Sequence, residues 1–248
     1  MELVRLTLGQ AYHVVLAADA EAVRGAVEGA RALVVTDGTA DPLFAQIKGR
    51  VPLPAVVLVT VGLDLPPPPP PAAVTATVDA GRLGVALLRV VVAATIRDLL
   101  LRSLRSVASR RGLHEKLRDG LALALSLEHR PIKTLSRMGN EVGCSPSTLS
   151  RAWRRAGVSR ETRGVFLRAA VLLRALILWL ERSELSWIEI ADAAGASLRA
   201  LESYTHEWFD APPSALEPAA VPSAVAEMEL HAFGWLLATD VGRAGSTR

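Results

Sequence analysis

Residues 134–155 read TLSRMGNEVGCSPSTLSRAWRR and contain two helical patterns separated by a turn. The first pattern consists of apolar residues at helical spacing, namely Leu135, Met138 and Val142. The sequence GCSP at 143–146 then breaks the pattern; Ser145 can cap a second helix, and Pro146 suits its first position, where no backbone N–H is needed. The stretch therefore predicts a helix-turn-helix whose second helix covers residues 145–156.

The second helix of this pair has an apolar face and a polar face. Leu149 and Trp153 are expected to point into the core. The opposite face then carries Ser147, Ser150, Arg151, Arg154 and Arg155. Because a recognition helix contacts DNA with such a face, we expect the function of the chain to begin here.

The positive charge of the chain is concentrated in its middle part. Residues 82–174 carry 19 basic and 6 acidic residues, a net charge of +13, whereas residues 1–81 carry −3 and residues 175–248 carry −7. A strongly basic segment favours a polyanionic partner, because neutralisation of phosphates dominates non-specific nucleic-acid affinity. A solvated basic surface is the alternative, but the charge coincides with the helix-turn-helix pattern, which favours nucleic acid.

The composition predicts a cytoplasmic protein that does not cross a membrane. The single cysteine, Cys144, excludes an internal disulfide framework and fits a reducing compartment, and no signal-peptide pattern is visible. The two long apolar runs, Leu83–Leu101 and Val165–Leu180, both contain arginine, which at the centre of a bilayer costs roughly 2.5–3.5 kcal/mol. We therefore expect buried or interface helices in both runs.

The first 80 residues alternate short β-branched runs with helical segments, which predicts an α/β domain with a parallel sheet. The expected strands are His13–Ala17, Ala32–Thr36, Ala55–Val61 and Val74–Val78. Six prolines at residues 66–71 form a stiff segment before the last of these strands.

Two positions carry a resemblance of Leu3–Ala93 to a response-regulator receiver domain. Asp37 ends LVVTD, where a receiver has its phospho-acceptor aspartate, and Thr60 ends VVLVT, where it has a hydroxyl. The acidic magnesium ligands after the first strand are missing, and Asp79 and Arg82 stand in place of the lysine after the last strand. The resemblance therefore implies a degenerate, phosphorylation-independent domain that serves dimerisation. For Asp37, a turn or helix-capping role and phosphorylation both stay open.

A long helix from about Arg82 to Val107 is predicted to follow this domain. Its apolar residues repeat every three or four positions, with arginines between them: Leu83, Leu87, Val90, Val91, Leu101 and Leu104. The stripe is wide enough to be shared between one chain and a partner. Self-association into a homodimer and core packing within one chain are both open at this point.

The helix-turn-helix pattern occurs again after an apolar helix that runs to about Arg182. Ser186 and Glu189 form a capping box, Gly195 marks the turn, and a second recognition helix is predicted over residues 197–209. The predicted fold class is an α/β N-terminal domain followed by an all-α double helix-turn-helix domain. The predicted parts are a receiver-like domain (1–81), a linker or dimerisation helix (82–111), a DNA-binding domain (112–216), and a tail whose short helix docks on the body (217–248).

Residues Leu113–Leu216 resemble the DNA-binding domain of the AraC/XylS family of transcription regulators. The motifs that carry the resemblance are S-x-x-x-L-S-R-x-W at 145–153, Ile190-Ala191 with Gly195, and WFDAPPS at 208–214. The resemblance implies two recognition helices that enter successive major grooves of double-stranded DNA. It also implies RNA polymerase or other regulators as further partners, and no cofactor.

By position, the resemblance places base contacts on Ser147, Ser150 and Arg151 and phosphate contacts on Thr148, Arg154 and Arg155. A guanidinium can bond guanine O6 and N7 at once, so Arg151 is expected to give about 1–3 kcal/mol of base discrimination. The phosphate contacts are expected to give affinity without sequence preference.

The second recognition helix departs from the family pattern. It has Ser203 where the family presents an arginine, it carries Glu202 and Glu207, and its turn is one residue short of the family's. Because carboxylates repel a phosphate backbone, we expect only weak DNA contacts through Ser197 and Arg199, or a role as scaffold and partner surface.

An enzyme is not expected from this sequence. The five histidines lack metal-ligand spacing, so we expect no metal site, and no nucleophile or phosphate-loop motif occurs. Cys144 is interpreted as a packing residue of its turn, with a thiol activated by the following helix as the alternative.

The main rival to a DNA-binding regulator is a regulator-like protein-interaction module that does not bind DNA specifically. The arginines of the first recognition helix distinguish the two. Exposed on one face they favour DNA, whereas pairing with carboxylates such as Glu141 and Glu161 favours a protein partner.

Overall fold

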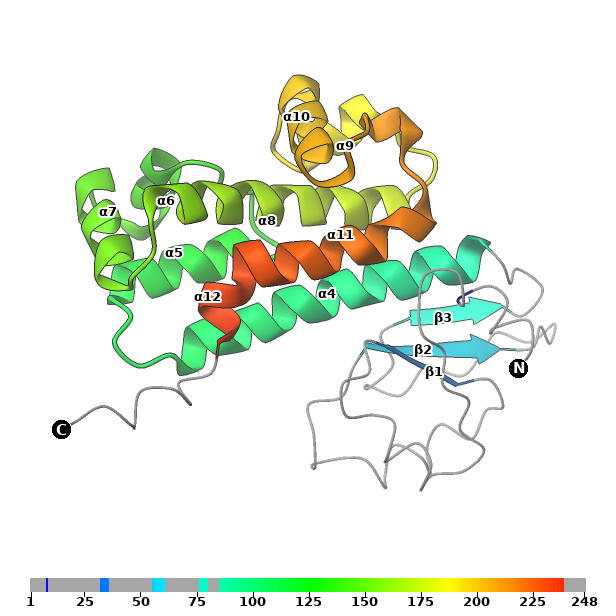
Figure 1. The fold of residues 1–248 in the computed structure, drawn as a ribbon, viewed down its shortest axis with the longest axis horizontal. Helices are drawn as coiled ribbons and strands as arrows, with labels where there is room; N and C mark the ends of the chain where they lie inside the picture. The colour runs from blue at the N-terminus through cyan, green and yellow to red at the C-terminus, as the bar shows by residue number, and fades with distance from the viewer. Residues whose placement is uncertain (1–7, 9–31, 36–54, 61–75, 80–84, 239–248) are drawn as a thin grey trace. The chain divides into compact units, whose positions relative to one another are not determined.

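A computed structural model describes residues 8, 32–35, 55–60, 76–79 and 85–238 (Figure 1). The predicted strand His13–Ala17, the candidate phospho-acceptor Asp37 and the prolines at 66–71 lie outside these residues. In the part of the chain that is described, no helix combines the length and apolar character needed to cross a membrane.

Three short strands precede the helices: β1 (Ala32–Val35), β2 (Ala55–Thr60) and β3 (Ala76–Asp79). They pair in parallel in the order β1-β2-β3, with Ala32 opposite Ala55 and Val57 opposite Ala76. These strands coincide with three of the predicted ones. The complete α/β domain and its likeness to a receiver stay predictions, because the segments that connect the strands are outside the described residues.

Residues 85–238 are helical. The α-helices are α4 (Val85–Ser109), α5 (Glu115–Leu125), α6 (Leu135–Val142), α7 (Pro146–Arg155), α8 (Arg160–Glu181), α9 (Trp187–Ala193), α10 (Leu198–Phe209), α11 (Val221–Met228) and α12 (Gly234–Leu237). Short 3₁₀ and π segments complete the chain: η2 (Pro213–Ala215), η3 (Pro218–Ala220) and η4 (Glu229–Phe233). The chain divides into two compact units, the first comprising 1–98, 176–184 and 215–223 and the second comprising 99–175, 185–214 and 224–248.

In the first unit, the beginning of α4 is bonded to the end of α8. The Arg89 guanidinium donates to the carbonyl oxygens of Trp179 and Leu180, the latter at 3.0 Å, and lies 5.3 Å from the Trp179 ring centroid. Arg97 and Glu181 form an ion pair, with nitrogen to oxygen distances of 2.7 and 2.8 Å. These bonds hold the beginning of α4 against the end of α8, although the two segments are far apart in the sequence.

The predicted apolar stripe of α4 is buried in part, since Val90 and Leu104 are half-buried. Leu87, Val91, Ile96 and Leu99 are each 1% exposed or less. Leu101, by contrast, is 49% exposed. The burial favours core packing as the main role of the stripe, and self-association through α4 stays a prediction.

In the second unit, the pairs α6–α7 and α9–α10 repeat one local structure with a shift of 52 residues, from the cap Thr134 to the cap Ser186. Gly143 and Gly195 occupy the same place in the two turns, with φ of 66° and 67°. The second helices begin at equivalent caps, Ser145 and Ser197. The two turns are therefore equal in length, so the second is not shortened relative to the first.

The two helix pairs are joined by the segment that precedes α6. The Pro131 ring packs against Gly195, where an added Cβ would lie 3.0 Å from the ring. Arg174 of α8 donates to the carbonyl oxygens of Ser126 and His129, at 3.1 and 2.6 Å. The absence of a side chain at Gly195 therefore allows both the left-handed backbone of the turn and the close contact with Pro131.

The tail packs beneath α7. Trp235 lies 5.2 Å from Trp153 and 5.7 Å from Phe166, and Phe166 lies 5.2 Å from Phe233, all between ring centroids. Arg110 donates to the carbonyl oxygen of Trp235 and lies 5.6 Å from its ring centroid. The prediction that the tail docks on the body is confirmed, and its contact surface includes the inner face of α7.

The equivalent glycines provide a matched test of the contact between the helix pairs. Gly143→Ala and Gly195→Ala both place a Cβ at a left-handed residue, which costs about 1–2 kcal/mol. Gly195→Ala also meets the Pro131 ring, whereas nothing lies within 4 Å at Gly143. We expect Gly195→Ala to lower the free energy of unfolding by about 1–3 kcal/mol more than Gly143→Ala, measured by urea denaturation.

Pro131→Gly, introduced with each glycine substitution, is the control, because it removes the ring together with the Cβ that lies 3.1 Å from the added Cβ at residue 195. It should remove most of the difference between the two variants. Equal destabilisation by Gly143→Ala and Gly195→Ala in the parent chain would contradict the proposed packing.

Candidate nucleic-acid interface

Two residues of the sequence specify the start of α7, a capping serine and a proline at the first helical position, as predicted. The Ser145 hydroxyl accepts the backbone N–H of Thr148 at 3.2 Å, and Pro146 occupies the first helical position. Ser145 is also within 2.8 Å of the Ser147 hydroxyl and 2.9 Å of the Thr148 hydroxyl. The hydroxyls at this end of the helix therefore form one small hydrogen-bonded group.

The rotation of α7 about its axis is fixed by what it buries. Leu149 and Trp153 are completely buried, as predicted, and Ala152 is 2% exposed. From α6, Met138 is completely buried as well. Since one face of α7 is committed to the core, the residues of the other face must be exposed.

Arg151, Arg154 and Arg155 are exposed on that outer face. At 3.6 residues per turn they fall within an arc of about 100°. Among the residues that the structure describes, no carboxylate lies within 4.0 Å of any of them; Glu141 instead pairs with Arg137 of its own helix, at 3.9 Å. The arginines thus meet the condition that favours DNA over a protein partner.

The polar residues predicted to contact DNA differ in their exposure. Ser147 is exposed, whereas Ser150 and Thr148 are half-buried. The Ser150 hydroxyl accepts a hydrogen bond from Arg163 of α8, at 3.4 Å. Of the predicted base contacts, Ser147 and Arg151 are therefore accessible, while Ser150 is partly engaged inside the chain.

The outer face of α10 has a different charge. Ser197 and Arg199 are exposed, and so is Glu202. Ser203 occupies the position of Arg151 after the shift of 52 residues, so the strongest specificity candidate of the first helix pair has no equivalent in the second. The expectation of weaker DNA contacts from the second helix pair is unchanged.

Glu207 requires a correction to the expectation that it repels phosphates. Its carboxylate bonds to Arg168 of α8 with distances of 2.8 and 2.7 Å, and this hydrogen bond raises the pKa of Arg168. Because the charge of Glu207 is balanced within the chain, Glu202 is the main source of repulsion on this helix.

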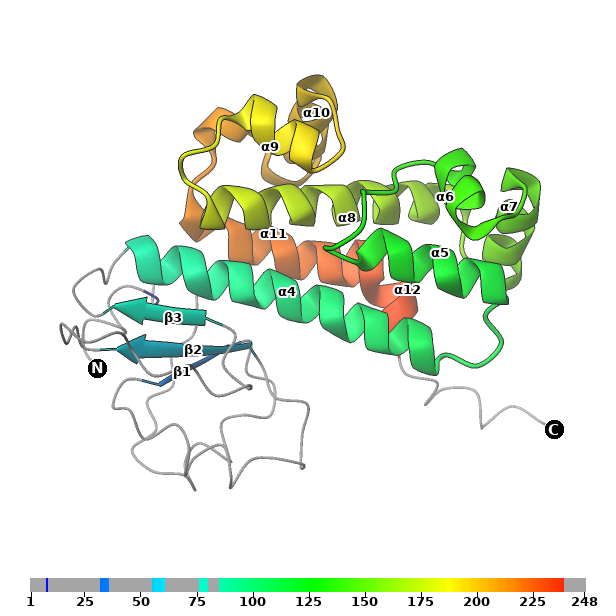
Figure 2. The same cartoon turned by 180° about the vertical axis from the view of Figure 1, so that it is seen from behind.

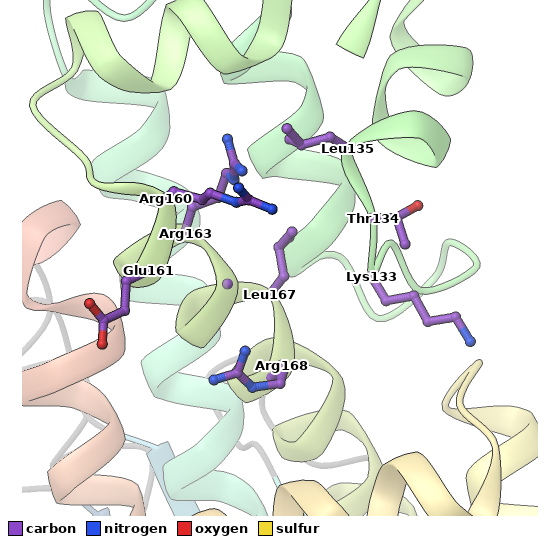
Figure 3. Close-up of a pocket in the computed structure, with 9 residues that line it drawn as sticks. Lys133, Thr134, Leu135, Arg160, Glu161, Arg163, Leu167 and Arg168 are labelled. Carbon is purple, nitrogen blue, oxygen red and sulfur yellow. The ribbon is translucent and has the colours of Figure 1, made fainter. Parts of the chain in front are cut away.

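Sequence reasoning missed three cations that lie near the first helix pair: Lys133, Arg160 and Arg163. Lys133 precedes Thr134, the cap of α6, and the two arginines are in the first turn of α8. The available signal was the RETR sequence at 160–163. All three line one open pocket; Figure 3 shows Arg160 and Arg163 side by side and Lys133 on the opposite wall, with its ammonium group directed away from them.

The described residues contain no group of three or more histidine, cysteine, aspartate or glutamate side chains that could hold a metal ion. Cys144 is a free thiol and is partly buried in the turn between α6 and α7. Its placement suits the packing role expected for it.

Comparison with known proteins gives no relative. No family model matches the chain. Neither a curated protein nor a solved structure matches it. The resemblance to AraC/XylS regulators therefore rests on its motifs, and what it implies for DNA contacts stays a proposal.

The cap of α9 yields a prediction about pH. The pKa of Glu189 is lowered because its carboxylate accepts hydrogen bonds from the Ser186 hydroxyl, at 2.7 Å, and from the Ser186 backbone N–H, at 2.8 Å. A lowered pKa means that the cap stabilises the fold above the usual glutamate pKa and loses this effect as the pH falls through the folded value. We expect Ser186→Ala to raise the pKa of Glu189, measured by NMR titration of its carboxyl carbon.

Ser197→Ala is the matched control, since Ser197 caps α10 through the backbone of Ala200 without a carboxylate. It should leave the Glu189 titration unchanged. An unaltered Glu189 pKa in Ser186→Ala would show that the hydroxyl bond is not formed in solution.

Proposed function

We propose that this protein is a sequence-specific DNA-binding transcription regulator that acts mainly through the first helix-turn-helix. Its recognition helix is α7, with Arg151 as the principal base-reading residue and Arg154 and Arg155 as phosphate contacts. DNA is double-stranded in this proposal, and the regulator is cytoplasmic and binds as a homodimer.

One observation carries the proposal: a capped helix has its inner face wholly buried and three arginines exposed without carboxylate partners among the described residues. Unpaired guanidinium groups on a rigid helix are suited to phosphates and to the O6 and N7 acceptors of guanine. The net charge of +13 over residues 82–174 supports the same partner.

A dimer is proposed because the two recognition helices are unequal. With Ser203 in place of an arginine and Glu202 exposed, α10 supplies less affinity than α7. Two copies of α7 on half-sites about one helical turn apart would recover that affinity. The rival function, a protein-interaction module, is favoured only by the acidic character of residues 175–248, which carry −7.

Selection of bound duplexes from a random DNA pool tests the proposal. The wild-type protein should enrich a motif, and Arg151→Ala should lose preference at one guanine and bind the motif roughly 5- to 150-fold more weakly, equivalent to about 1–3 kcal/mol. Affinities are measured by fluorescence anisotropy at a fixed salt concentration.

Arg182→Ala is the control, because it removes the same charge from an exposed arginine outside α7. It should retain the motif and most of the affinity. If the wild-type chain enriches no motif, the proposed regulator is wrong and the interaction module takes its place.

A further inference from the structure

An open groove of about 630 Å³ lies between the start of α6 and the first half of α8 (Figure 3). Nine residues line it, of which four are cationic and one is acidic: Lys133, Thr134, Leu135, Arg160, Glu161, Arg163, Gly164, Leu167 and Arg168. Because its walls come from the helix before the turn and the helix after α7, the groove is separate from the outer face of α7 itself.

The charges in this groove do not cancel. Arg168 is paired with Glu207, and Glu161 points away from the guanidinium groups of Arg160 and Arg163 in Figure 3. In the described part of the chain, no carboxylate is within 4.0 Å of Lys133 or of those two arginines. Three uncompensated cations therefore remain.

The two arginines repel each other. The pKa of Arg163 is lowered, first by burial and then by the charge of Arg160. The partial positive charges at the first turns of α6 and α8 act in the same direction. An anion in the groove would relieve this repulsion, and a phosphate matches the flat, multi-donor geometry of guanidinium groups.

The groove is connected to the recognition helix. Arg163 donates to the Ser150 hydroxyl of α7 at 3.4 Å, so the cations continue beside the face that carries Arg151. Figure 1 and Figure 2 both show α8 running from the end next to α7 towards the second helix pair. A duplex with its major groove on α7 would present its adjacent backbone to this side of the protein.

We propose that Lys133, Arg160 and Arg163 form a binding site for the phosphate backbone of the DNA that α7 reads. The inference rests on the proposed function, since it needs a duplex on α7. The groove has no base-reading role: it adds affinity that is independent of sequence and that falls with salt. An extended backbone suits its open shape better than a free phosphate, although both offer the same oxygen atoms.

The test uses Lys133→Ala and Arg160→Ala in the full chain, on the selected duplex and on a scrambled duplex. Both residues are exposed, so the variants should unfold at the wild-type temperature. Each should weaken binding to both duplexes by the same factor, roughly three- to tenfold, and reduce the slope of log K against log salt by about 0.9. The enriched motif should not change.

Duplexes with single neutral methylphosphonate linkages locate the contact. One or two adjacent linkages should weaken wild-type binding and have no further effect on Arg160→Ala. Arg182→Ala, which removes an equal charge elsewhere, should respond to these linkages as the wild type does.

Two results would overturn the inference while leaving the proposed function intact. In the first, Arg151→Ala weakens binding but Lys133→Ala and Arg160→Ala retain wild-type affinity and salt slope. In the second, those groove variants bind DNA normally but lose a thermal stabilisation that inorganic phosphate gives the wild type at constant ionic strength, which would assign the groove to a free phosphate. If the wild type selects no motif, the proposed function itself has failed.

Discussion

The complete burial of Trp153 is the constraint on which the orientation of α7 depends. Its ring packs against Phe166 of α8 and Trp235 of the tail, at centroid distances of 5.8 and 5.2 Å, and these two rings also contact each other. Burying an aromatic side chain of this size stabilises the fold by several times the energy of an exposed ion pair. Rotation of α7 would expose this surface, so the helix keeps one orientation, and that orientation leaves its arginines in solvent.

The two helix pairs show how one local structure can support different surfaces. Both have a capped first helix, a left-handed glycine and a serine-capped second helix. These features determine backbone geometry only. The outer faces are set by other residues, with Arg151 in one and Ser203 at the equivalent place in the other. An equal fold therefore does not imply equal affinity for DNA.

Ion pairing inside the second unit decides which charges can act on a partner. Arg168 and Glu207 neutralise each other, and Arg102 pairs with Glu229 at 2.9 Å, so these residues contribute mainly to structure. Arg151 and Arg160 are exposed and have no such partner among the described residues. The net charge calculated from the sequence counts paired and unpaired arginines equally, although only the unpaired ones are available to phosphates.

The sequence by itself determined the caps at Ser145 and Ser186 and the inner face of α7, because caps and apolar periodicity act within a few residues of the chain. Only the tertiary structure decided that Ser150 is engaged by Arg163, that Glu207 is neutralised by α8, and that the tail packs against α7. These contacts join residues between 13 and 82 positions apart, as from Ser150 to Arg163 and from Trp153 to Trp235. No local pattern encodes such distances, since they follow from how the helices pack.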